Sequence, residues 1–346
     1  MSKKFFKIAL NLEKEEKDLQ KDSVSFTAVS SEESLALQQP PQPAKKRNAF
    51  LKDMKKNWRL HIIILPVLVF FIVFSYLPMV GIVTAFMDYR PTRGIFDSTW
   101  VGFEHFERLF SDSDFGLVFR NTVVMALLNL IFGFLAPVVF ALLISEIRVK
   151  WVNKTFQIMS YLPNFVAPVV ICNLVTQFLS VDGAVTGIFV AFGMEEQDML
   201  SNPDYFWAIN TFVNVWQTMG YTAIVFTAAI MGTNQDLHEA AVLDGANRWQ
   251  RVIHVTIPGI LPMLVTMFIL KVGLMFSTGF DNILLLYRVD TYDTADVIST
   301  YTYRQSFGES NYGYAAAVGL FQSVIATALL LITNWASKMI AKTSLF

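Results

Sequence analysis

The sequence predicts an all-α membrane protein with about six transmembrane helices, on the grounds of its composition and its hydropathy pattern. Hydrophobic residues make up 54% of the 346 residues, whereas charged residues make up only 16%. Several apolar runs contain few charges, and each is long enough to cross about 30 Å of hydrocarbon as a helix. The expected spans are residues 61–86, 121–144, 156–179, 205–231, 260–286 and 314–340.

The first 59 residues differ from the rest of the chain because they are polar and charged and include a proline-bearing linker, SSEESLALQQPPQPAKKR. We expect residues 1–59 to form a cytoplasmic N-terminal tail that is partly disordered, with a membrane-surface helix as the alternative. Residues 60–346 then form the transmembrane domain. The first apolar run follows this long charged tail, so we expect it to be a retained span and not a cleavable signal peptide.

Basic residues predict the orientation of the spans, because cytoplasmic loops of membrane proteins carry an excess of Lys and Arg. The loop of residues 194–205, MEEQDMLSNPDY, has no basic residue, and the loop of residues 87–120 has four arginines. We therefore expect both termini in the cytoplasm and the two loops outside. The basic residues assigned to the cytoplasmic side are Lys45, Lys46, Arg47, Lys52, Lys55, Lys56, Arg59, Arg148, Lys150, Lys154, Lys338 and Lys342.

The sequence carries no pattern typical of an enzyme, a metal site or a nucleic-acid-binding domain. Its net charge of -1 does not favour nucleic acid, and Cys172 is the single cysteine. No G-x-x-x-x-G-K-[ST] or G-x-S-x-G run occurs, so we expect no ATP binding by this chain and no catalytic residues. The histidines are scattered and suggest no metal cluster: His61, His105, His238 and His254.

Residues 238–262, HEAAVLDGANRWQRVIHVTIPGILP, form a polar insert between the fourth and fifth spans. The pattern predicts a helix with Asp236 at its N-cap, a turn at Gly245 and a second short helix that Pro258 ends. With Arg248 and Arg251 the insert is expected to face the cytoplasm. Because connecting loops are usually a few residues long, this length favours a docking element over a simple connection.

Polar side chains recur at helical spacing in the fourth and fifth apolar runs. Such residues are costly inside a membrane, so they are expected to face a substrate pathway or to hydrogen-bond between helices. For these two stripes the pathway is our preferred interpretation. The fourth run contains Asn210, Asn214, Gln217 and Tyr221 at i, i+4, i+7 and i+11, beside Gly220, and the fifth contains Lys271, Thr278 and Asn282 at i, i+7 and i+11.

Lys271 is a charge deep inside the fifth span, where insertion costs about 2.5 to 3.5 kcal/mol. It must therefore find a carboxylate, a carbonyl or water. One hypothesis is that it holds an acidic sugar or a cluster of hydroxyls, and the other is a structural pair with a neighbouring span or with a partner chain. Asp281 is not its natural partner, because ten residues separate the two side chains on one helix.

EAAVLDGANRWQRVIHVTIPGILP resembles the EAA loop of ABC-importer permeases, with Val255 and Ile257 in place of the usual Ile and Leu. VGFEHFERLF, SYLPNFVAPVVI, YDTADVISTYTYR and NYGYAAAVGLFQSVIATALLLITNW resemble carbohydrate-uptake (maltose-type) permeases, above all the LplB-like branch for oligosaccharides and polysaccharide fragments. The resemblance implies a type I ABC importer permease fold and a coupling loop at residues 234–258. The residues it assigns to ATPase coupling are Glu239, Ala240, Ala241, Asp244, Gly245 and Ala246.

The same resemblance implies the function and partners of the chain. It would be the permease subunit of an ATP-driven sugar importer in a bacterial cell membrane, without chemistry or cofactors of its own. Its partners would be a second, homologous permease, an extracytoplasmic sugar-binding protein that docks near residues 87–120 and 284–312, and two cytosolic ATPases that bind ATP and Mg²⁺. With the polar stripes it assigns the substrate pathway to Asn210, Asn214, Gln217, Gly220, Tyr221, Lys271, Ser277, Thr278, Asp281 and Asn282.

Three alternatives remain at this stage. An ion-gradient-driven secondary transporter would favour internal repeats and paired carboxylates within the membrane, and Asp281 is the only acidic residue near span depth. An enzyme acting on lipid-linked sugars would need a group of acids or histidines at one membrane face. Within the permease family, the cargo could instead be another polyol, such as a glycerol phosphate.

Overall fold

The computed structural model describes residues 56–276 and 279–340. Almost all of the expected N-terminal tail lies outside these residues, as do Ser277 and Thr278 of the expected pathway. The chain divides into two compact units, Met1–Leu77 and Pro78–Phe346, each of which is described by itself. A tail boundary at residue 59 therefore stays a prediction.

The described part of the first unit is one apolar helix. It consists of α3 (Trp58–Phe71) and a π-helical turn at Ile72–Tyr76, and a 3₁₀ segment at Leu77–Phe86 continues into the second unit. None of the residues of α3 is buried. Because its Ile, Leu, Val and Phe side chains are exposed on every side, this helix suits contact with lipid or with another chain.

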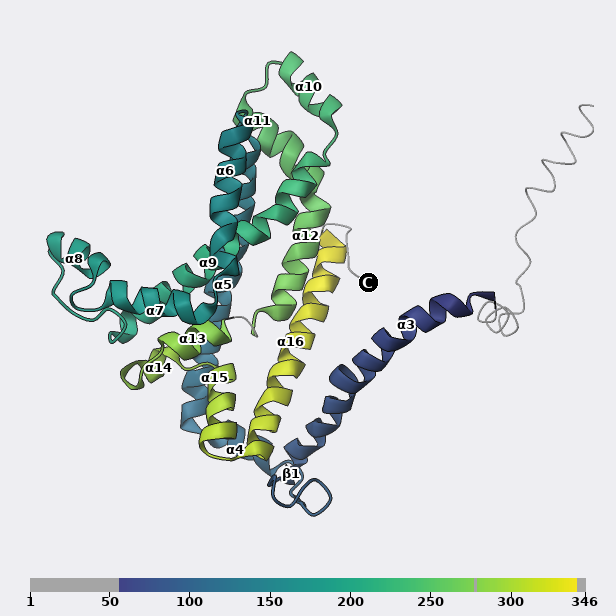
Figure 1. The fold of residues 1–346 in the computed structure, drawn as a ribbon, viewed down its shortest axis with the longest axis vertical. Helices are drawn as coiled ribbons and strands as arrows, with labels where there is room; N and C mark the ends of the chain where they lie inside the picture. The colour runs from purple at the N-terminus through teal and green to yellow at the C-terminus, as the bar shows by residue number, and fades with distance from the viewer. Residues whose placement is uncertain (1–55, 277–278, 341–346) are drawn as a thin grey trace, which may run out of the picture. The chain divides into compact units, whose positions relative to one another are not determined.

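The second unit is a bundle of helices with one small hairpin (Figure 1). Two long helix contacts organise it: α5 packs along α9 in the same direction, and α12 packs along α16 in the opposite direction. Its elements are β1 (Met87–Asp88), β2 (Thr99–Trp100), α4 (Glu104–Ser111), α5 (Ser113–Ser145), α6 (Lys150–Tyr161), η3 (Leu162–Phe165), α7 (Pro168–Leu179), α8 (Ala184–Ala191), α9 (Pro203–Met231), α10 (Gln235–Leu243), α11 (Arg248–Arg251), η4 (Val252–Thr256), α12 (Ile257–Leu274), α13 (Phe280–Leu286), η5 (Val289–Thr291), α14 (Tyr292–Ala295), α15 (Ile298–Tyr303), η6 (Arg304–Gly308) and α16 (Tyr312–Ile340).

The all-α fold class is confirmed, and five helical segments of the described residues are long and apolar enough to cross a membrane. The 29-residue helix α9, which contains the expected fourth span, is not among them. Its row of amide side chains lowers its hydropathy below that of the other long helices. The five segments are Trp58–Phe86, Ser113–Ser145, Pro168–Ala191, Arg248–Leu274 and Tyr312–Met339.

Two of the expected spans have different boundaries in the structure. Residues 156–179 are not one helix, because α6 ends at Tyr161 and a 3₁₀ turn with Pro163 precedes α7. Residues 260–286 are also divided: α12 ends at Leu274, and α13 begins after Gly279, whose φ of 90° is left-handed. Hydropathy missed both breaks because the apolar pattern runs through them, whereas the backbone changes direction.

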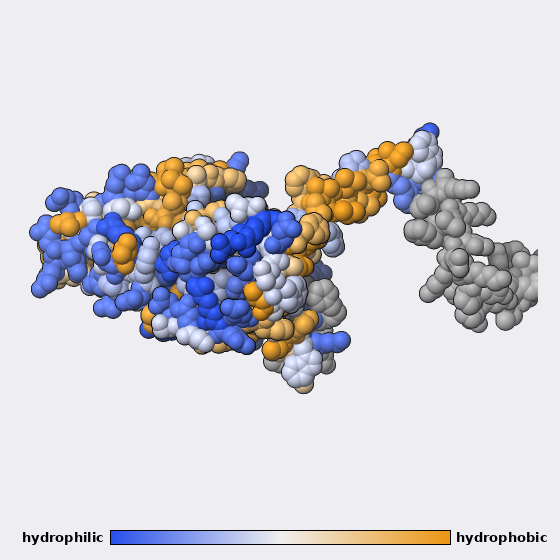
Figure 2. Space-filling view, turned by 90° about the horizontal axis from the view of Figure 1, so that it is seen from below, coloured by the Kyte–Doolittle hydropathy of each residue, from blue (hydrophilic) through white to orange (hydrophobic). Residues whose placement is uncertain are grey.

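One end of the second unit is a polar cap built from β1, α4, α14 and α15 (Figure 1). Asp112 accepts a hydrogen bond from Tyr301 (2.8 Å), and Arg304 pairs with the buried Asp296 (2.7 Å). Burial raises the pKa of the Asp296 carboxyl, and hydrogen bonds from Thr300 and Arg304 oppose that rise. Seen from this end, the surface is mostly hydrophilic (Figure 2), as expected of a face in contact with water.

Candidate functional site

Four side chains of the expected pathway lie together in a buried amide cluster, which we define as Asn210, Asn214, Gln217 and Asn282. The Nδ2 group of Asn282 donates to Asn214 Oδ1 (2.9 Å) and to Gln217 Oε1 (3.0 Å). Asn214 in turn donates to the backbone oxygen of Asn210 (3.0 Å) on the same helix. All but Asn214 are buried. The cluster thus joins α9 to α13 in the interior of the bundle.

The amide cluster extends to α7 and α5 through two sulfur contacts. The thiol of Cys172 lies 3.6 Å from Asn282 Oδ1, and Asn210 Nδ2 lies 3.6 Å from the sulfur of Met125. Cys172 and Met125 both belong to the apolar core around the cluster. Four helices therefore meet at one polar point, which suits hydrogen bonding between helices, one of the two interpretations of these residues.

Gly220, three residues beyond Gln217 on α9, allows a close contact with α6. A Cβ atom at this position would overlap the backbone carbonyl of Ser160 and would lie 2.8 Å from the Ser160 Cβ. No side chain larger than hydrogen fits there without moving the α6 backbone. Gly220 therefore has a packing role in the structure, and the next residue, Tyr221, is exposed.

Among the described residues, Lys271 and Asp281 make no side-chain hydrogen bond to the amide cluster. Lys271 is on α12 and Asn282 on α13, so these two residues do not share one helix face as expected, and Thr278 lies outside the described residues. α12 ends at Leu274 and α13 begins at Phe280, so Lys271 and Asn282 belong to two separate helices. Asp281 is exposed, and the structure gives it no contact with Lys271.

Lys271 bonds to a neighbouring helix within the chain. Its Nζ group donates to the backbone oxygen of Gly133 on α5, at 2.5 Å. Gly133 leaves room for this bond, because a Cβ there would lie only 2.8 Å from Lys271 Nζ. The contact satisfies one donor of a half-buried ammonium group, as the structural interpretation of Lys271 expects.

We expect Lys271→Met to fold and to support uptake. The substitution removes a hydrogen bond of roughly 1.5–3 kcal/mol, but it also removes a charge whose insertion costs about 2.5–3.5 kcal/mol. Melting temperature in detergent and uptake by the whole importer would measure the two effects. A selective loss of acidic saccharide uptake at unchanged stability would instead assign Lys271 to the substrate.

The polar insert forms a helix, a turn and a second helix at the end of the unit opposite the polar cap (Figure 1). Asn234, and not the expected Asp236, caps α10, because its side chain accepts the Asp236 N–H (2.9 Å). Gly245 has a φ of 80°, which only glycine adopts freely, so the expected turn is present. Asn247 and Gln250 then form a reciprocal capping box at the start of α11.

The second helix of the insert was expected to end at Pro258, but it does not. It continues through a π-helical turn at Val252–Thr256 into α12, so that Arg248–Leu274 is one segment. The wide turn just before Pro258 accommodates a residue that lacks an N–H and would crowd the preceding turn of a regular α-helix. The insert is therefore continuous with the fifth span, and a movement of one would reach the other.

The surface of α10 is apolar for a helix outside the bundle. None of its residues is buried, and all of them except the half-buried His238 and Ala241 are exposed, Glu239 and Ala240 included. Leu243 is 88% exposed, and Leu237, Val242 and Trp249 are also exposed. Neighbouring apolar side chains left open to water are typical of a surface that a partner covers.

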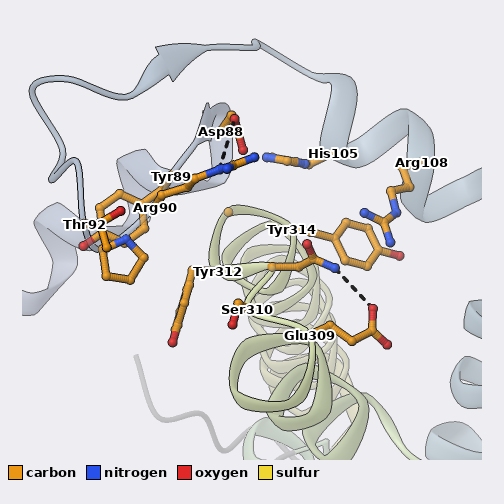
Figure 3. A pocket seen from close by; sticks show the side chains of 13 residues that line it. Asp88, Tyr89, Arg90, Thr92, His105, Arg108, Glu309, Ser310, Tyr312 and Tyr314 are labelled. Atoms are coloured by element: carbon orange, nitrogen blue, oxygen red, sulfur yellow. Dashed lines mark hydrogen bonds and ion pairs between the residues drawn. The ribbon is translucent and has the colours of Figure 1, made fainter.

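The structure also shows a pocket that the sequence did not predict. This outer pocket has a volume of about 530 Å³ and lies in the polar cap, between the hairpin region, α4 and the start of α16 (Figure 3). Its polar lining includes Asp88, Tyr89, Arg90, His105, Arg108 and Tyr312. No motif connects these residues, because more than 200 positions separate the two parts of the lining.

These features define a class of protein: a multi-pass membrane subunit with a polar cluster among its helices and an exposed helical insert at one end. Residues 133–342 match the family described as the binding-protein-dependent transport system inner membrane component. The chain belongs to this family. The predicted fold, family and membrane location are confirmed.

The chain aligns with nearly the full length of two curated relatives. The chain is 33% identical to Protein LplB of Bacillus subtilis over 308 residues, which cover 89% of this chain and 97% of the relative. It is 34% identical to the polygalacturonan/rhamnogalacturonan transport system permease protein YteP of Bacillus subtilis, over 87% of this chain and 94% of the relative.

Two solved structures resemble the chain with a TM-score of 0.78 and 37% identity. One is a bacterial ABC transporter involved in the import of the acidic polysaccharide alginate. The match covers 84% of this chain and 99% of the chain in that structure. The other is a bacterial alginate ABC transporter in complex with a periplasmic protein bound to alginate pentasaccharide, with coverages of 85% and 99%.

Proposed function

We propose that the chain is the permease subunit of an ATP-driven importer that takes up oligosaccharides or polysaccharide fragments. The observation that carries this proposal is the exposed α10 helix, whose apolar side chains have no cover among the described residues. A separate ATPase that binds this helix would cover them. The names of the similar proteins, which concern polygalacturonan, rhamnogalacturonan and alginate, support a saccharide cargo.

The coupling surface consists of the exposed face of α10 and the turn that follows it. Glu239, Ala240 and Ala241 lie on α10, and Asp244, Gly245 and Ala246 form the turn. Because Arg248–Leu274 is one segment, a displacement of this surface by an ATPase would move the fifth span directly. The segment also carries Lys271, which bonds to α5, so two spans would respond together.

The assembly that follows from this proposal contains a second, homologous permease, two cytosolic ATPases and an extracytoplasmic sugar-binding protein. ATP and Mg²⁺ bind to the ATPases. The insert and both termini face the cytoplasm, and the polar cap faces outward to receive the binding protein. The opposite positions of the insert and the cap in the second unit support this orientation (Figure 1).

Membership of a binding-protein-dependent transport family argues against an ion-gradient-driven transporter and against an enzyme acting on lipid-linked sugars. A different cargo, such as a glycerol phosphate, remains the alternative within the family. Stimulation of ATP hydrolysis by purified saccharides, with glycerol phosphate alongside, separates the two. Stimulation by glycerol phosphate alone would refute the saccharide cargo.

In pull-downs from solubilised membranes, we expect the Glu239→Lys and Gly245→Pro variants each to co-purify with at least about tenfold less ATPase than wild type. Glu239→Lys reverses an exposed charge in the contact. Gly245→Pro imposes a φ near −65° where the chain has 80°. The second permease should remain bound to both variants, because no residue of α10 is buried in the bundle.

The matched control is Glu107→Lys, the same charge reversal on an exposed residue of α4 at the opposite end of the unit. It should keep both partners. If no ATPase co-purifies with wild type, or if both insert variants still bind it, the assignment of the coupling surface is wrong.

A further inference from the structure

We propose that the outer pocket is a binding subsite for a carboxylated sugar ring, a uronic-acid residue of the incoming saccharide. This inference rests on the proposed function, because it assumes a saccharide cargo and an outward-facing polar cap. To the proposed function it adds the location of one binding subsite and the chemical class of its ligand. The volume of about 530 Å³ lies in the range of small-molecule sites.

The walls of the pocket are held by contacts between its three parts. His105 donates from Nε2 to the backbone oxygen of Met87 (3.0 Å), which ties α4 to the hairpin. Gly313 lets the first turn of α16 approach the same place, because a Cβ there would overlap the Met87 carbonyl and lie 2.7 Å from His105 Nε2. The pocket is therefore formed in the chain alone.

Two tyrosines provide aromatic surface in the pocket. The rings of Tyr89 and Tyr312 meet edge to face, with centroids 6.3 Å apart and an interplanar angle of 83°. Both side chains line the pocket (Figure 3). An aromatic ring combines an apolar face with a polar tip, and a sugar ring likewise has C–H faces and a hydroxyl rim. Tyrosines thus suit a pyranose better than an ion.

The guanidinium of Arg108 is the cation in the pocket that is free for a ligand anion. It lies 4.3 Å from the centroid of the Tyr314 ring. Its N–H groups have no carboxylate partner among the described residues. Arg90 is only loosely paired with Asp88, at 3.8 Å between Nε and Oδ2. Arginine binds a carboxylate through two parallel hydrogen bonds, which favours a uronate.

Two carboxylates in the lining narrow the ligand class further. Asp88 and Glu309 face the same space as the arginines, and Glu309 accepts a hydrogen bond from Asn311 (3.2 Å). They would repel a doubly charged phosphate, but they accept hydrogen bonds from hydroxyls. A uronic acid has one carboxylate and several hydroxyls, so it suits both the cations and the carboxylates of this pocket.

Backbone strain marks the pocket as well. Ser310, which lines it, has a φ of 59°, and it is the positive-φ residue other than glycine among the described residues. Such conformations cost free energy and gather at sites where ligands bind. Ser310 lies near Tyr312 in the pocket lining (Figure 3).

Direct binding to the assembled importer in lipid nanodiscs, without the binding protein, tests the subsite. The probes are a labelled trigalacturonate and a labelled neutral glucose trisaccharide. We expect Arg108→Gln to weaken trigalacturonate binding about tenfold, because it removes a charged hydrogen bond, and to leave the neutral trisaccharide unchanged. Arg90→Gln should have a smaller effect in the same direction.

Arg93→Gln is the matched control. Arg93 is exposed in the same loop as Arg90, but it does not line the pocket. Arg108→Lys, which keeps the charge, should retain part of the affinity, and melting temperatures report any loss of folding. Wild type that binds no trigalacturonate, or Arg108→Gln that binds it normally, overturns the subsite. Equal losses for both probes overturn the uronate class. Saccharide-stimulated ATP hydrolysis tests the proposed function separately.

Discussion

Gly220→Val is expected to prevent α6 from packing against α9 and to abolish uptake. The added side chain would meet the backbone of Ser160, which cannot rotate away as a flexible side chain can. Overpacking a well-packed core costs about 1–3 kcal/mol, and more where a backbone must move. Melting temperature and the yield of monodisperse protein in detergent measure the damage to the fold, and uptake measures its consequence.

A pair of alanine variants provides the control. Gly220→Ala should already destabilise the chain, because the Cβ alone overlaps Ser160. Gly319→Ala on α16 should be tolerated, since nothing lies within 4 Å of a Cβ at that position. Equal melting temperatures for the two alanine variants would show that Gly220 is not a packing contact.

The second large effect is expected from Asn282→Leu. Leucine has the same branched shape as asparagine but is bulkier and has no donor, so it leaves the buried side-chain oxygen of Gln217 and the half-buried one of Asn214 without their hydrogen bonds. Each unsatisfied buried acceptor costs about 1–3 kcal/mol. We expect a clear fall in melting temperature and a loss of uptake, because α13 would lose its polar connection to α9.

Asn129→Leu is the matched control for the amide cluster. Asn129 is also a buried amide in a long helix, but it donates to the carbonyl of Met125 four residues earlier in the same helix. Its loss should be mild. If Asn282→Leu keeps the melting temperature of wild type and reduces the uptake of particular saccharides only, the cluster contacts the substrate and does not mainly join helices.

Much of the organisation was accessible from the sequence. Apolar runs located the long helices, and the turn at Gly245 followed from glycine's freedom to adopt a positive φ. The EAA-type insert identified the family, because its residues are consecutive and its pattern is long. The positions of the amides in α9 were also visible, since helical spacing alone places Asn210, Asn214 and Gln217 on one face.

Only the tertiary structure decided what those residues contact. It divided residues 260–286 at Gly279, which separated Lys271 from Asn282 and joined Asn282 to the amides of α9. It paired Lys271 with Gly133, and it formed the outer pocket from segments more than 200 positions apart. Hydropathy reports whether a segment is buried in lipid or protein, but not where its backbone turns or which helix it meets. Those outcomes depend on packing between segments distant in the chain, which no local pattern contains.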